Sequence, residues 1–476
     1  MDYTDLYIDG VWQSGTENKR FDVINPADET VITSVASASV DDAKAAINAA
    51  QNAFADWAGR TPRERSIVLR KAFDLMTERL DDFAKLIILE NGKAYPDAIG
   101  EATYAAEFFR WFSEEAVRSD GMITHAPASG ARIVVQHKPA GIAVLITPWN
   151  YPAAMGTRKI APALAAGCPV IIKPASETPL TMLALMPLLE EAGVPKGLVN
   201  VLPSSQSSAI VDTMLSDSRV RVVSFTGSTE VGRKLLHSAA DQVLKPAMEL
   251  GGNAPLLVLE DANIDTAVQG TMLAKMRNLG EACTAANRIY VHKNIADEFT
   301  KKLTLEMKNL KVGNGFDSDV QVGPLINENT RNKVAGFVED AISKGAILHT
   351  GGKVPEGKGY YYPPTVLSDV PKNSNCVHDE IFGPVAAIQT FENLESVIED
   401  ANDTEYGLVA YVFTENMKLG MSVCERLEYG MVGLNRGLVS DPAAPFGGCK
   451  QSGLGREGGH EGMLEFTETQ YISAEW

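Results

Sequence analysis

Arg221-Val-Val-Ser-Phe-Thr-Gly-Ser-Thr-Glu-Val-Gly232 predicts a β-strand that leads through a short loop into a helix. The first turn of such a helix presents free N–H groups and the positive end of the helix dipole, which together suit a pyrophosphate. The segment is not a P-loop, because Arg233 and Lys234 follow Gly232 where a P-loop has Lys and then Ser or Thr. A helix cap without a ligand would explain this segment equally well.

The sequence on both sides of this segment alternates between strand and helix signals. A second alternating series starts near 256–259 and continues to about 440. Alternating strands and helices predict parallel, doubly wound sheets, and hence an α/β fold. In the first series we expect strands at 141–146, 170–173, 199–202 and 222–224, and helices at about 153–166, 180–192 and 229–239.

Short strand-like pieces near Gly10 and Asn25 open the chain, and three helical patterns follow them. Ser39 is the expected cap of the first helix, the second runs from about 62 to 91, and the third from about 95 to 119. Residues 123–137 then predict an exposed hairpin, and the tail 465–476 alternates like an edge strand. Exposed edges seek partners, so the tail could pair with the hairpin, within one chain or between chains.

The composition excludes several classes of protein. The chain has 476 residues, of which 45% are apolar and 22% are charged, so it is expected to be globular rather than disordered. Its 43 basic and 61 acidic residues give a net charge of −18, which repels nucleic acid and anionic membrane surfaces. The N-terminus does not resemble a signal peptide, and no apolar run reaches the roughly 20 residues of a membrane helix.

Five scattered cysteines show no pairing or metal-ligand spacing, so we expect no metal site and a soluble cytoplasmic protein. A second glycine pattern, Gly453-Leu-Gly455-Arg-Glu-Gly458, matches a dinucleotide fingerprint in its spacing. Too little chain follows Gly458 for the rest of a βαβ unit, so we expect a tight turn there.

Three short segments carry chemically useful groups. Small residues surround Cys283 and leave room for a substrate to approach its sulfur, although a lone cysteine is also often a small buried hydrophobe. Glu249 precedes two glycines and could be a base or simply the end of a helix or strand. Asn150 follows a predicted strand, so its amide could stabilise an oxyanion or cap the next helix.

Taken together, seven ordered motifs resemble the aldehyde dehydrogenase superfamily over essentially the whole chain. The resemblance implies an aldehyde-dehydrogenase-like α/β fold with two doubly wound domains and a small β oligomerisation element. We expect a dinucleotide-binding domain at 1–120 and 139–249, a catalytic domain at 250–455, and an oligomerisation element at 121–138 and 456–476. The motifs are PWN at 148–150, KPASETP at 173–179, FTGSTEVG at 225–232, ELGGNAP at 249–255, GEACTAANR at 280–288, EIFGP at 380–384 and PFGGCKQSGLGRE at 445–457.

The family's reaction oxidises an aldehyde to an acid. The resemblance implies that the Cys283 thiolate attacks the aldehyde and that Asn150 and the Cys283 N–H stabilise the oxyanion. Hydride then leaves to a nicotinamide, and Glu249 activates the water that hydrolyses the thioester. Relatives that pass the acyl group to coenzyme A generally lack this Glu. Lys159 and Glu457 match a proton-relay pair, although both could be ordinary structural charges.

The same resemblance places the cofactor. Lys173 matches a residue that contacts the adenosine ribose or its phosphate, and Ser176 stands where NAD-preferring relatives often carry a Glu. A serine tolerates a 2′-phosphate, so NADP is the favoured cofactor and NAD the alternative, with Glu177 as a complication. The other expected cofactor contacts are Thr147, Pro148, Trp149, Asn150, Gly227, Ser228, Gly232, Leu250, Glu380 and Phe382.

Within the superfamily the chain most resembles succinate-semialdehyde dehydrogenases, in which two arginines and a serine hold the substrate carboxylate. Here these residues are Arg158, Arg277 and Ser440, and an arginine fork suits a carboxylate. Either arginine could instead belong to an internal salt bridge. Glutarate semialdehyde, or an aromatic aldehyde between Trp149 and Tyr151, is the alternative substrate. A non-catalytic binding protein is a remote third hypothesis.

Two departures from the family pattern bear on Cys283. Ala285 stands where many relatives have a second cysteine, so a disulfide switch there is not expected. Glu281 replaces the more usual Gln, and if it faced the site it would raise the pKa of Cys283 by like-charge repulsion. The resemblance also implies a homodimer or homotetramer, with the tail strand joining a neighbour's sheet.

Overall fold

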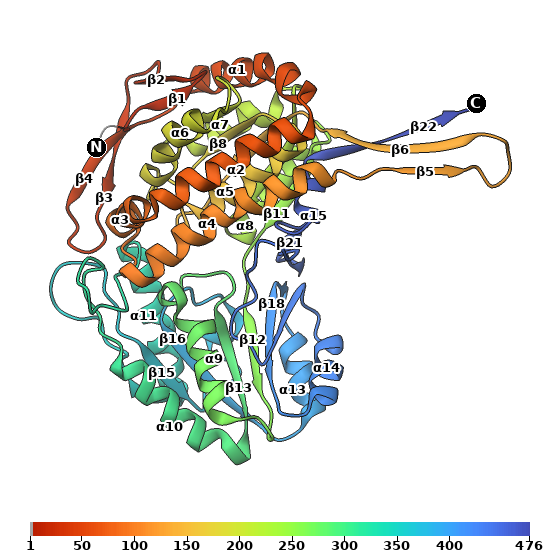
Figure 1. Cartoon of the computed structure of the whole chain (residues 1–476). Helices are drawn as coiled ribbons and strands as arrows, with labels where there is room; N and C mark the ends of the chain where they lie inside the picture. Colours follow the sequence, from red (N-terminus) through yellow and green to blue (C-terminus); the bar gives the residue numbers. More distant parts are fainter. Residues whose placement is uncertain (1–2) are drawn as a thin grey trace.

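Two open α/β sheets form the body of the molecule, and a narrow three-stranded sheet projects from it (Figure 1). The computed structural model describes residues 3–476. Within that range, no helix is both long and apolar enough to cross a membrane.

The first sheet has eight strands, and its central strands pair in parallel. Antiparallel pairing occurs at its two edges, where β1 and β2 lie on one side and β21 on the other. In spatial order the strands are β2 (Val11–Gln13), β1 (Leu6–Ile8), β9 (Val199–Val201), β8 (Val170–Lys173), β7 (Ile142–Ile146), β10 (Val220–Thr226), β11 (Lys245–Glu249) and β21 (Gly453–Leu454).

Helices cover both faces of this sheet, as the strand pattern predicts. Ala143 and Leu145 of β7 pack into the core beneath one helical layer, whereas Val144 packs into the core beneath the other. The sheet is therefore doubly wound. The first layer contains α2 (Pro62–Glu78), α3 (Leu80–Asn91), α4 (Tyr95–Glu115), α5 (Ala154–Ala166) and α6 (Leu180–Ala192), and the second contains α1 (Val40–Gly59), α7 (Ser207–Ser216) and α8 (Thr229–Ala240).

Three details differ from the expected elements. The helix expected over 62–91 is two helices, because Arg79 leaves helical geometry at φ −118° and ψ 18° and its side chain pairs with Glu191. The helix α7 was not predicted, and the short η1 (Ala116–Arg118) ends the third pattern. The expected cap at Ser39 is confirmed, since its hydroxyl accepts from the N–H of Asp42.

The second sheet has seven strands and is parallel except at β14. Leu256 and Leu257 of β12 point into different cores, so this sheet is also doubly wound. The strand order is β14 (Ile347–Thr350), β15 (Thr365–Ser368), β16 (Val385–Phe391), β13 (Ala286–His292), β12 (Ala254–Val258), β18 (Val409–Phe413) and β19 (Met431–Leu434). Its helices are α9 (Ile264–Met276), η2 (Arg277–Gly280), α10 (Lys293–Asn309), α11 (Glu328–Ser343), α12 (Asn375–His378), α13 (Leu394–Asn402) and α14 (Met417–Arg426).

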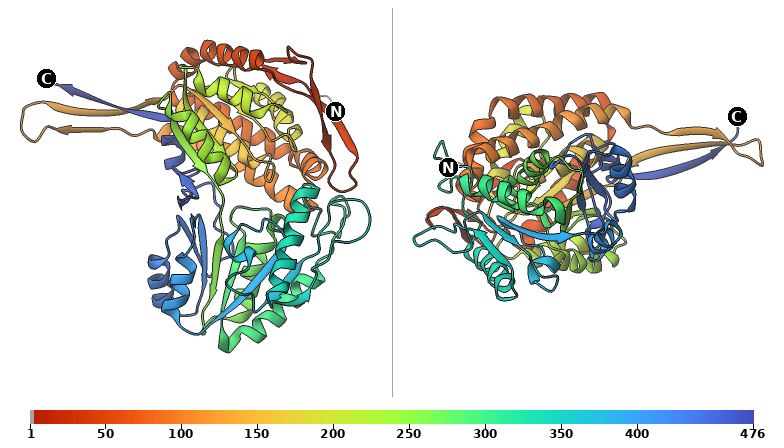
Figure 2. Two further views of the ribbon diagram at one scale, coloured as in Figure 1. Left: turned by 180° about the vertical axis from the view of Figure 1, so that it is seen from behind. Right: turned by 90° about the horizontal axis from the view of Figure 1, so that it is seen from below.

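The projecting sheet, which we call the arm, consists of β5 (Met122–His125), β6 (Arg132–Pro139) and β22 (Thr467–Ala474). The arm stands clear of the body in every view (Figures 1 and 2). Its hairpin agrees with the prediction, and the tail pairs with β6 of its own chain, from Thr467 opposite Pro139 to Ala474 opposite Arg132. Smaller elements are the hairpin of β3 (Arg20–Ile24) and β4 (Val31–Ala36), the pair β17 (Tyr406–Gly407) and β20 (Cys449–Lys450), and α15 (Glu461–Leu464).

The second glycine pattern is structural rather than a phosphate loop. Gly453 pairs with Glu249 at the sheet edge and has φ +139°. A Cβ at Gly453 would lie 1.9 Å from the carbonyl oxygen of Met248, so no other residue fits there.

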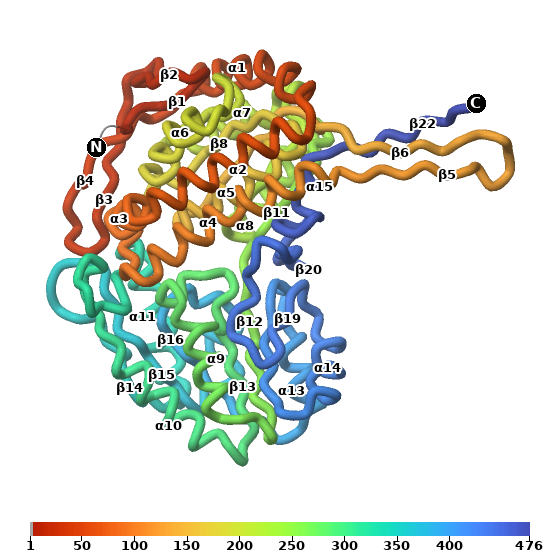
Figure 3. Tube along the Cα trace, viewed as in Figure 1, coloured from red at the N-terminus to blue at the C-terminus, as the bar shows by residue number. Residues whose placement is uncertain are grey.

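The chain passes from the first sheet to the second between β11 and β12 and comes back through β20 and β21 (Figure 3). The loops that follow β7, β10 and β11 therefore face the second sheet. Strand carboxyl ends of this kind are where doubly wound sheets bind ligands.

Candidate active site

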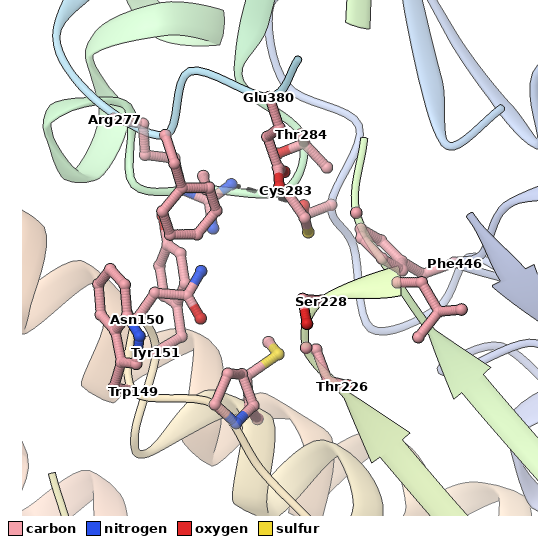
Figure 4. A pocket seen from close by; sticks show the side chains of 18 of the residues that line it. Trp149, Asn150, Tyr151, Thr226, Ser228, Arg277, Cys283, Thr284, Glu380 and Phe446 are labelled. Atoms are coloured by element: carbon pink, nitrogen blue, oxygen red, sulfur yellow. Dashed lines mark hydrogen bonds between the residues drawn. The ribbon is translucent and has the colours of Figure 1, made fainter. Parts of the chain in front are cut away.

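A cavity of about 260 Å³ lies between the two sheets. Loops after three strands of the first sheet form one side (Figure 4). Residues 277–284 and 380–382, which precede strands β13 and β16 of the second sheet, close the other. The lining residues are Tyr104, Pro148, Trp149, Asn150, Tyr151, Met155, Arg158, Thr226, Gly227, Ser228, Leu250, Gly251, Arg277, Ala282, Cys283, Thr284, Thr330, Lys333, Glu380, Phe382, Ser440 and Phe446.

Cys283 is half-buried, and its sulfur points into the open centre of the cavity (Figure 4). Burial raises the pKa of its thiol to about 12, and the positive charge of Arg158 acts in the opposite direction. The turn before it is strained, since Asn278 has φ 49° and Leu279 has φ 43°. The N–H of Asn278 donates to Asp97 Oδ2 at 2.9 Å, which holds this turn in place.

Asn150 lies across the cavity from Cys283 (Figure 4). Its Nδ2 donates one hydrogen bond, to the carbonyl of Glu281 at 3.0 Å. An amide nitrogen carries two hydrogens, so a second remains for a ligand oxygen. The backbone carbonyl of Asn150 accepts hydrogen bonds from Lys93 Nζ at 2.7 Å and from Asn278 Nδ2 at 3.0 Å. These two bonds fix the orientation of the loop that carries Asn150.

A buried ion pair between Lys93 and Glu101 supports the Asn150 loop from behind. Both side chains are fully buried. Lys93 donates to Asn150, and Glu101 Oε1 accepts from the N–H of Ala153 at 2.9 Å and of Ala154 at 3.3 Å. Sequence reasoning missed this pair, because neither residue belongs to a motif.

Glu249 ends β11 but does not line the cavity. Its carboxylate is buried, and among the described residues neither oxygen has a hydrogen-bond partner. Burial and the neighbouring charge of Glu457 raise the pKa of Glu249 well above that of an ordinary glutamate, while Arg158 and Lys159 lower it. The carboxylate therefore belongs to a charged cluster beside the cavity.

Glu457 is the acidic centre of that cluster. It pairs with Arg158 Nε at 2.7 Å and with Lys159 Nζ, which also donates to Ser224 Oγ at 2.8 Å. The Arg158 guanidinium lies 3.7 Å from the Phe446 ring centroid. Arg158 thus has the internal salt bridge that the sequence left open, and it also lines the cavity.

Arg277 and Ser440 form another part of the wall. The distance between Arg277 Nη1 and Ser440 Oγ is 3.5 Å. The guanidinium lies over two aromatic rings, 5.1 Å from the centroid of Tyr151 and 5.8 Å from that of Tyr104. No ion pair joins Arg277 to a carboxylate among residues 3–476, but the Asp97 carboxylate is near enough to act on its charge.

Further predicted residues lie at a helix start and a strand end of the first sheet. Ser228 caps α8 by accepting from the N–H of Val231 at 3.4 Å. Lys173 ends β8 and is buried, and burial lowers its pKa while Glu177 raises it. Ser176 Oγ donates to Glu177 Oε2 at 3.2 Å, so this carboxylate lies beside the serine.

Three other residues predicted to contact the cofactor, Trp149, Glu380 and Phe382, line the cavity itself. Glu380 Oε1 accepts from the N–H of Gly252 at 3.2 Å, and burial raises the pKa of Glu380 to about 7. The rings of Trp149 and Phe382 meet edge to face with centroids 5.4 Å apart. The N–H groups of a helix N-terminus and a buried cation can donate to phosphate oxygens, and a carboxylate can accept from ribose hydroxyls, so the residues present fit a dinucleotide.

Not every predicted residue lines the cavity. Gly232 packs against Leu250 instead, since a Cβ there would lie 2.4 Å from Leu250 Cδ2. The predicted residues outside the lining are Thr147, Lys159, Lys173, Ser176, Glu177, Gly232 and Glu249. Other lining residues were missed. Within the quoted motifs these are Thr226, Gly251, Ala282, Thr284 and Phe446, whereas Tyr104, Met155, Thr330 and Lys333 belong to no motif.

Glu281 does not face the cavity. Its side chain is buried, and Oε1 accepts from the N–H of Ile326 at 3.1 Å. Burial raises the pKa of Glu281 to about 8, and the Ile326 bond opposes this shift. The condition for like-charge repulsion between Glu281 and Cys283, a Glu281 side chain that faces the site, is therefore not met. All five cysteines are free, and in the described part of the chain no three His, Cys, Asp or Glu side chains gather as metal ligands would.

The sequence matches the profile of the Aldehyde dehydrogenase family over residues 12–472, and the chain therefore belongs to this family. It is 52% identical over 442 residues to the succinate-semialdehyde dehydrogenase of Paenarthrobacter nicotinovorans, covering 93% of this chain and 98% of that protein. It is 44% identical to the succinate-semialdehyde dehydrogenase of Escherichia coli strain K12 that is named for NADP(+), covering 98% and 96% of the two chains. A glutarate-semialdehyde dehydrogenase of Pseudomonas aeruginosa is also 44% identical, with the same coverage.

Solved structures agree with this assignment. An NADP-dependent enzyme from Escherichia coli superposes with a TM-score of 0.98 at 44% identity, covering 100% of this chain and 98% of that one. A succinate-semialdehyde dehydrogenase from Burkholderia pseudomallei superposes with a TM-score of 0.97 at 44% identity, covering 99% and 98%. The aldehyde-dehydrogenase-like α/β fold is thereby confirmed.

Proposed function

We propose that this chain oxidises succinate semialdehyde to succinate, with NADP as the preferred cofactor and NAD as the alternative. One observation carries the proposal: Arg158, Arg277 and Ser440 line the same cavity as Cys283 and Asn150. The names of the two succinate-semialdehyde dehydrogenases reported above, one of them specifying NADP(+), support it.

Cys283 is the nucleophile in this proposal. Its thiol pKa of about 12 means that the proton must leave as sulfur bonds to the aldehyde carbon. Glu249, whose charge acts on Cys283, accepts that proton when it is ionised. The oxygen of the resulting thiohemiacetal accepts two hydrogen bonds. One comes from the free side-chain N–H of Asn150 and the other from the backbone N–H of Cys283.

Hydrolysis completes the reaction. A bound nicotinamide cofactor supplies the acceptor for the hydride that the oxidation releases. A thioester then remains on Cys283, and Glu249 directs a water molecule onto its carbon. Lys159 and Glu457, beside Glu249, carry the proton away from the site. The acid leaves and the thiol is restored.

The two arginines counteract the charge of the molecule. A net charge of −18 repels an anionic substrate over most of the surface. Arg277, which has no ion-pair partner in the described chain, supplies a local positive charge beside Ser440. Arg158 can bind the substrate carboxylate only through its two terminal nitrogens, because its Nε is already paired with Glu457.

NADP is compatible with the residues predicted to contact the adenosine ribose. Ser176 can donate to a 2′-phosphate, and Lys173 lies at the end of β8 nearby. Glu177 already accepts from Ser176 and would have to turn away from the phosphate. This competition leaves NAD as a working alternative.

Glutarate semialdehyde is a second candidate, because a relative of that name matches at 44% identity. It differs from succinate semialdehyde by one methylene, which a pocket discriminates by roughly 1–3 kcal/mol.

We also propose that the arm joins copies of the chain into a homodimer or homotetramer in the cytoplasm. The domain boundaries given above remain a prediction.

The test is steady-state oxidation of succinate and glutarate semialdehydes with NADP and with NAD. We expect kcat/KM to be highest for succinate semialdehyde with NADP. Arg158→Ala and Arg277→Ala should each lower it at least tenfold while affecting butanal, a neutral aldehyde, much less. If butanal is the better substrate, or if the arginine variants act equally on both aldehydes, the substrate proposal is wrong.

A further inference from the structure

Two tyrosine hydroxyls in the cavity wall have no explained role. Tyr104 and Tyr151 line the cavity of Cys283, yet each hydroxyl oxygen is buried and has no hydrogen-bond partner among the described residues. A buried polar group without a partner destabilises a protein by about 1–3 kcal/mol, so a ligand group that pairs with it is correspondingly favoured.

The surroundings of the two rings identify that ligand group. A second cavity, of about 510 Å³, shares Tyr104, Tyr151, Arg277 and Ser440 with the first, so these four residues form the wall between them. Arg277 lies over both rings, at 5.8 Å and 5.1 Å from their centroids. An anion held by Arg277 would therefore lie next to both phenols.

A carboxylate has about four acceptor sites, of which a guanidinium fork fills two. Phenol O–H groups can fill the others without adding charge to a buried site. Burial raises the pKa of both tyrosines, so both remain donors at any assay pH. Lys93 Nζ lies 3.9 Å from the Tyr151 ring centroid, and a cation over the ring strengthens the O–H as a donor.

We propose that the Tyr104 and Tyr151 hydroxyls donate hydrogen bonds to the substrate carboxylate beside Arg277, and so help to select carboxylated aldehydes. This inference rests on the proposed function and deepens it. It assigns to Tyr151 a polar role, in contrast to the aromatic-aldehyde alternative, in which only its ring would matter.

The test compares Tyr104→Phe and Tyr151→Phe with the wild-type enzyme, using succinate semialdehyde and butanal as substrates. Each variant loses one oxygen atom and keeps its ring. We expect KM for succinate semialdehyde to rise about tenfold in each, with kcat within about twofold. The ratio of kcat/KM for succinate semialdehyde to that for butanal should fall by about the same factor.

Tyr362→Phe is the matched control, since Tyr362 is fully buried in the core of the second sheet and lines neither cavity. It should leave that ratio as in the wild type. If the wild type prefers succinate semialdehyde but neither cavity variant changes the ratio, the hydroxyl assignment is wrong and the proposed function stands. If the wild type does not prefer the carboxylated aldehyde, the proposed function itself fails.

Discussion

At the level of single residues, the protonation of Glu249 controls when it can act as a base. Burial and the charge of Glu457 raise its pKa, so the ionised form is gained only as pH rises above the usual range of a carboxylate. We therefore expect the rate of thioester hydrolysis to increase with pH until Glu249 is ionised. Removing the charge of Glu457 should lower the pKa of Glu249 and shift that increase to lower pH.

The measurement is the pH profile of kcat for Glu457→Gln, under conditions where a pre-steady-state burst shows hydrolysis to be limiting. The midpoint should fall by about one pH unit, which corresponds to roughly 1.4 kcal/mol of removed repulsion. Glu457→Asp keeps the charge and serves as the control, so its midpoint should stay near that of the wild type. A midpoint that moves upward in Glu457→Gln would contradict this account.

The residue scale also shows what sequence could and could not foresee. Asn150, Cys283 and Glu380 meet in one cavity, as expected for groups in loops where a doubly wound sheet binds ligands. The pairing of Lys159 with Glu457 joins residues 298 positions apart, and only the folded chain shows that Arg158 shares the same carboxylate. The direction of Glu281 likewise depends on Ile326, which no local pattern indicates.

At the level of elements, the Lys93–Glu101 pair links α4 and the turn before it to the start of α5. Lys93→Met would leave the Glu101 charge buried without its partner and would remove a donor from the Asn150 carbonyl. We expect the free energy of unfolding to fall by about 3–5 kcal/mol and kcat to fall as the oxyanion donor loses its support. Urea denaturation and steady-state kinetics measure the two effects.

Lys85→Met is the control for this variant, because the Lys85–Asp81 pair lies on the exposed surface of α3. Exposed pairs contribute little, so its stability should be close to that of the wild type. Equal losses in the two variants would show that the buried pair has no special role. The activity of Lys93→Met distinguishes a positioning role from a purely structural one, since kcat should fall more than the folded fraction does.

Helices and strands with a regular pattern were predictable, and those set by distant partners were not. The strand at Val170–Lys173 and the helix at Leu180–Ala192 match their predictions in full, because hydrophobic runs and glycine stops mark their ends. No Gly or Pro lies between 63 and 91 to mark the break at Arg79, and its ion-pair partner Glu191 comes from another element. The local sequence pattern therefore predicts one helix where the structure has α2 and α3.

At the level of the whole molecule, the arm exposes apolar side chains that a monomer would not bury. Ile123 on β5 is 70% exposed and Tyr471 on β22 is 58% exposed. The sheet order β22-β6-β5 leaves both outer strands with an unpaired edge. Open edges beside apolar side chains favour association with another chain, and because the tail already pairs with its own β6, the arm would join a neighbour as a unit.

Ile123→Glu should therefore convert the wild-type oligomer into a smaller species, because a charge buried at the contact would be left unpaired. Light scattering after gel filtration measures the mass directly. Ile67→Glu is the matched control: Ile67 is 59% exposed on α2, away from the arm, so this variant should keep the wild-type mass. A monomeric wild type, or an Ile123→Glu variant of unchanged mass, would show that the arm does not join copies of this chain.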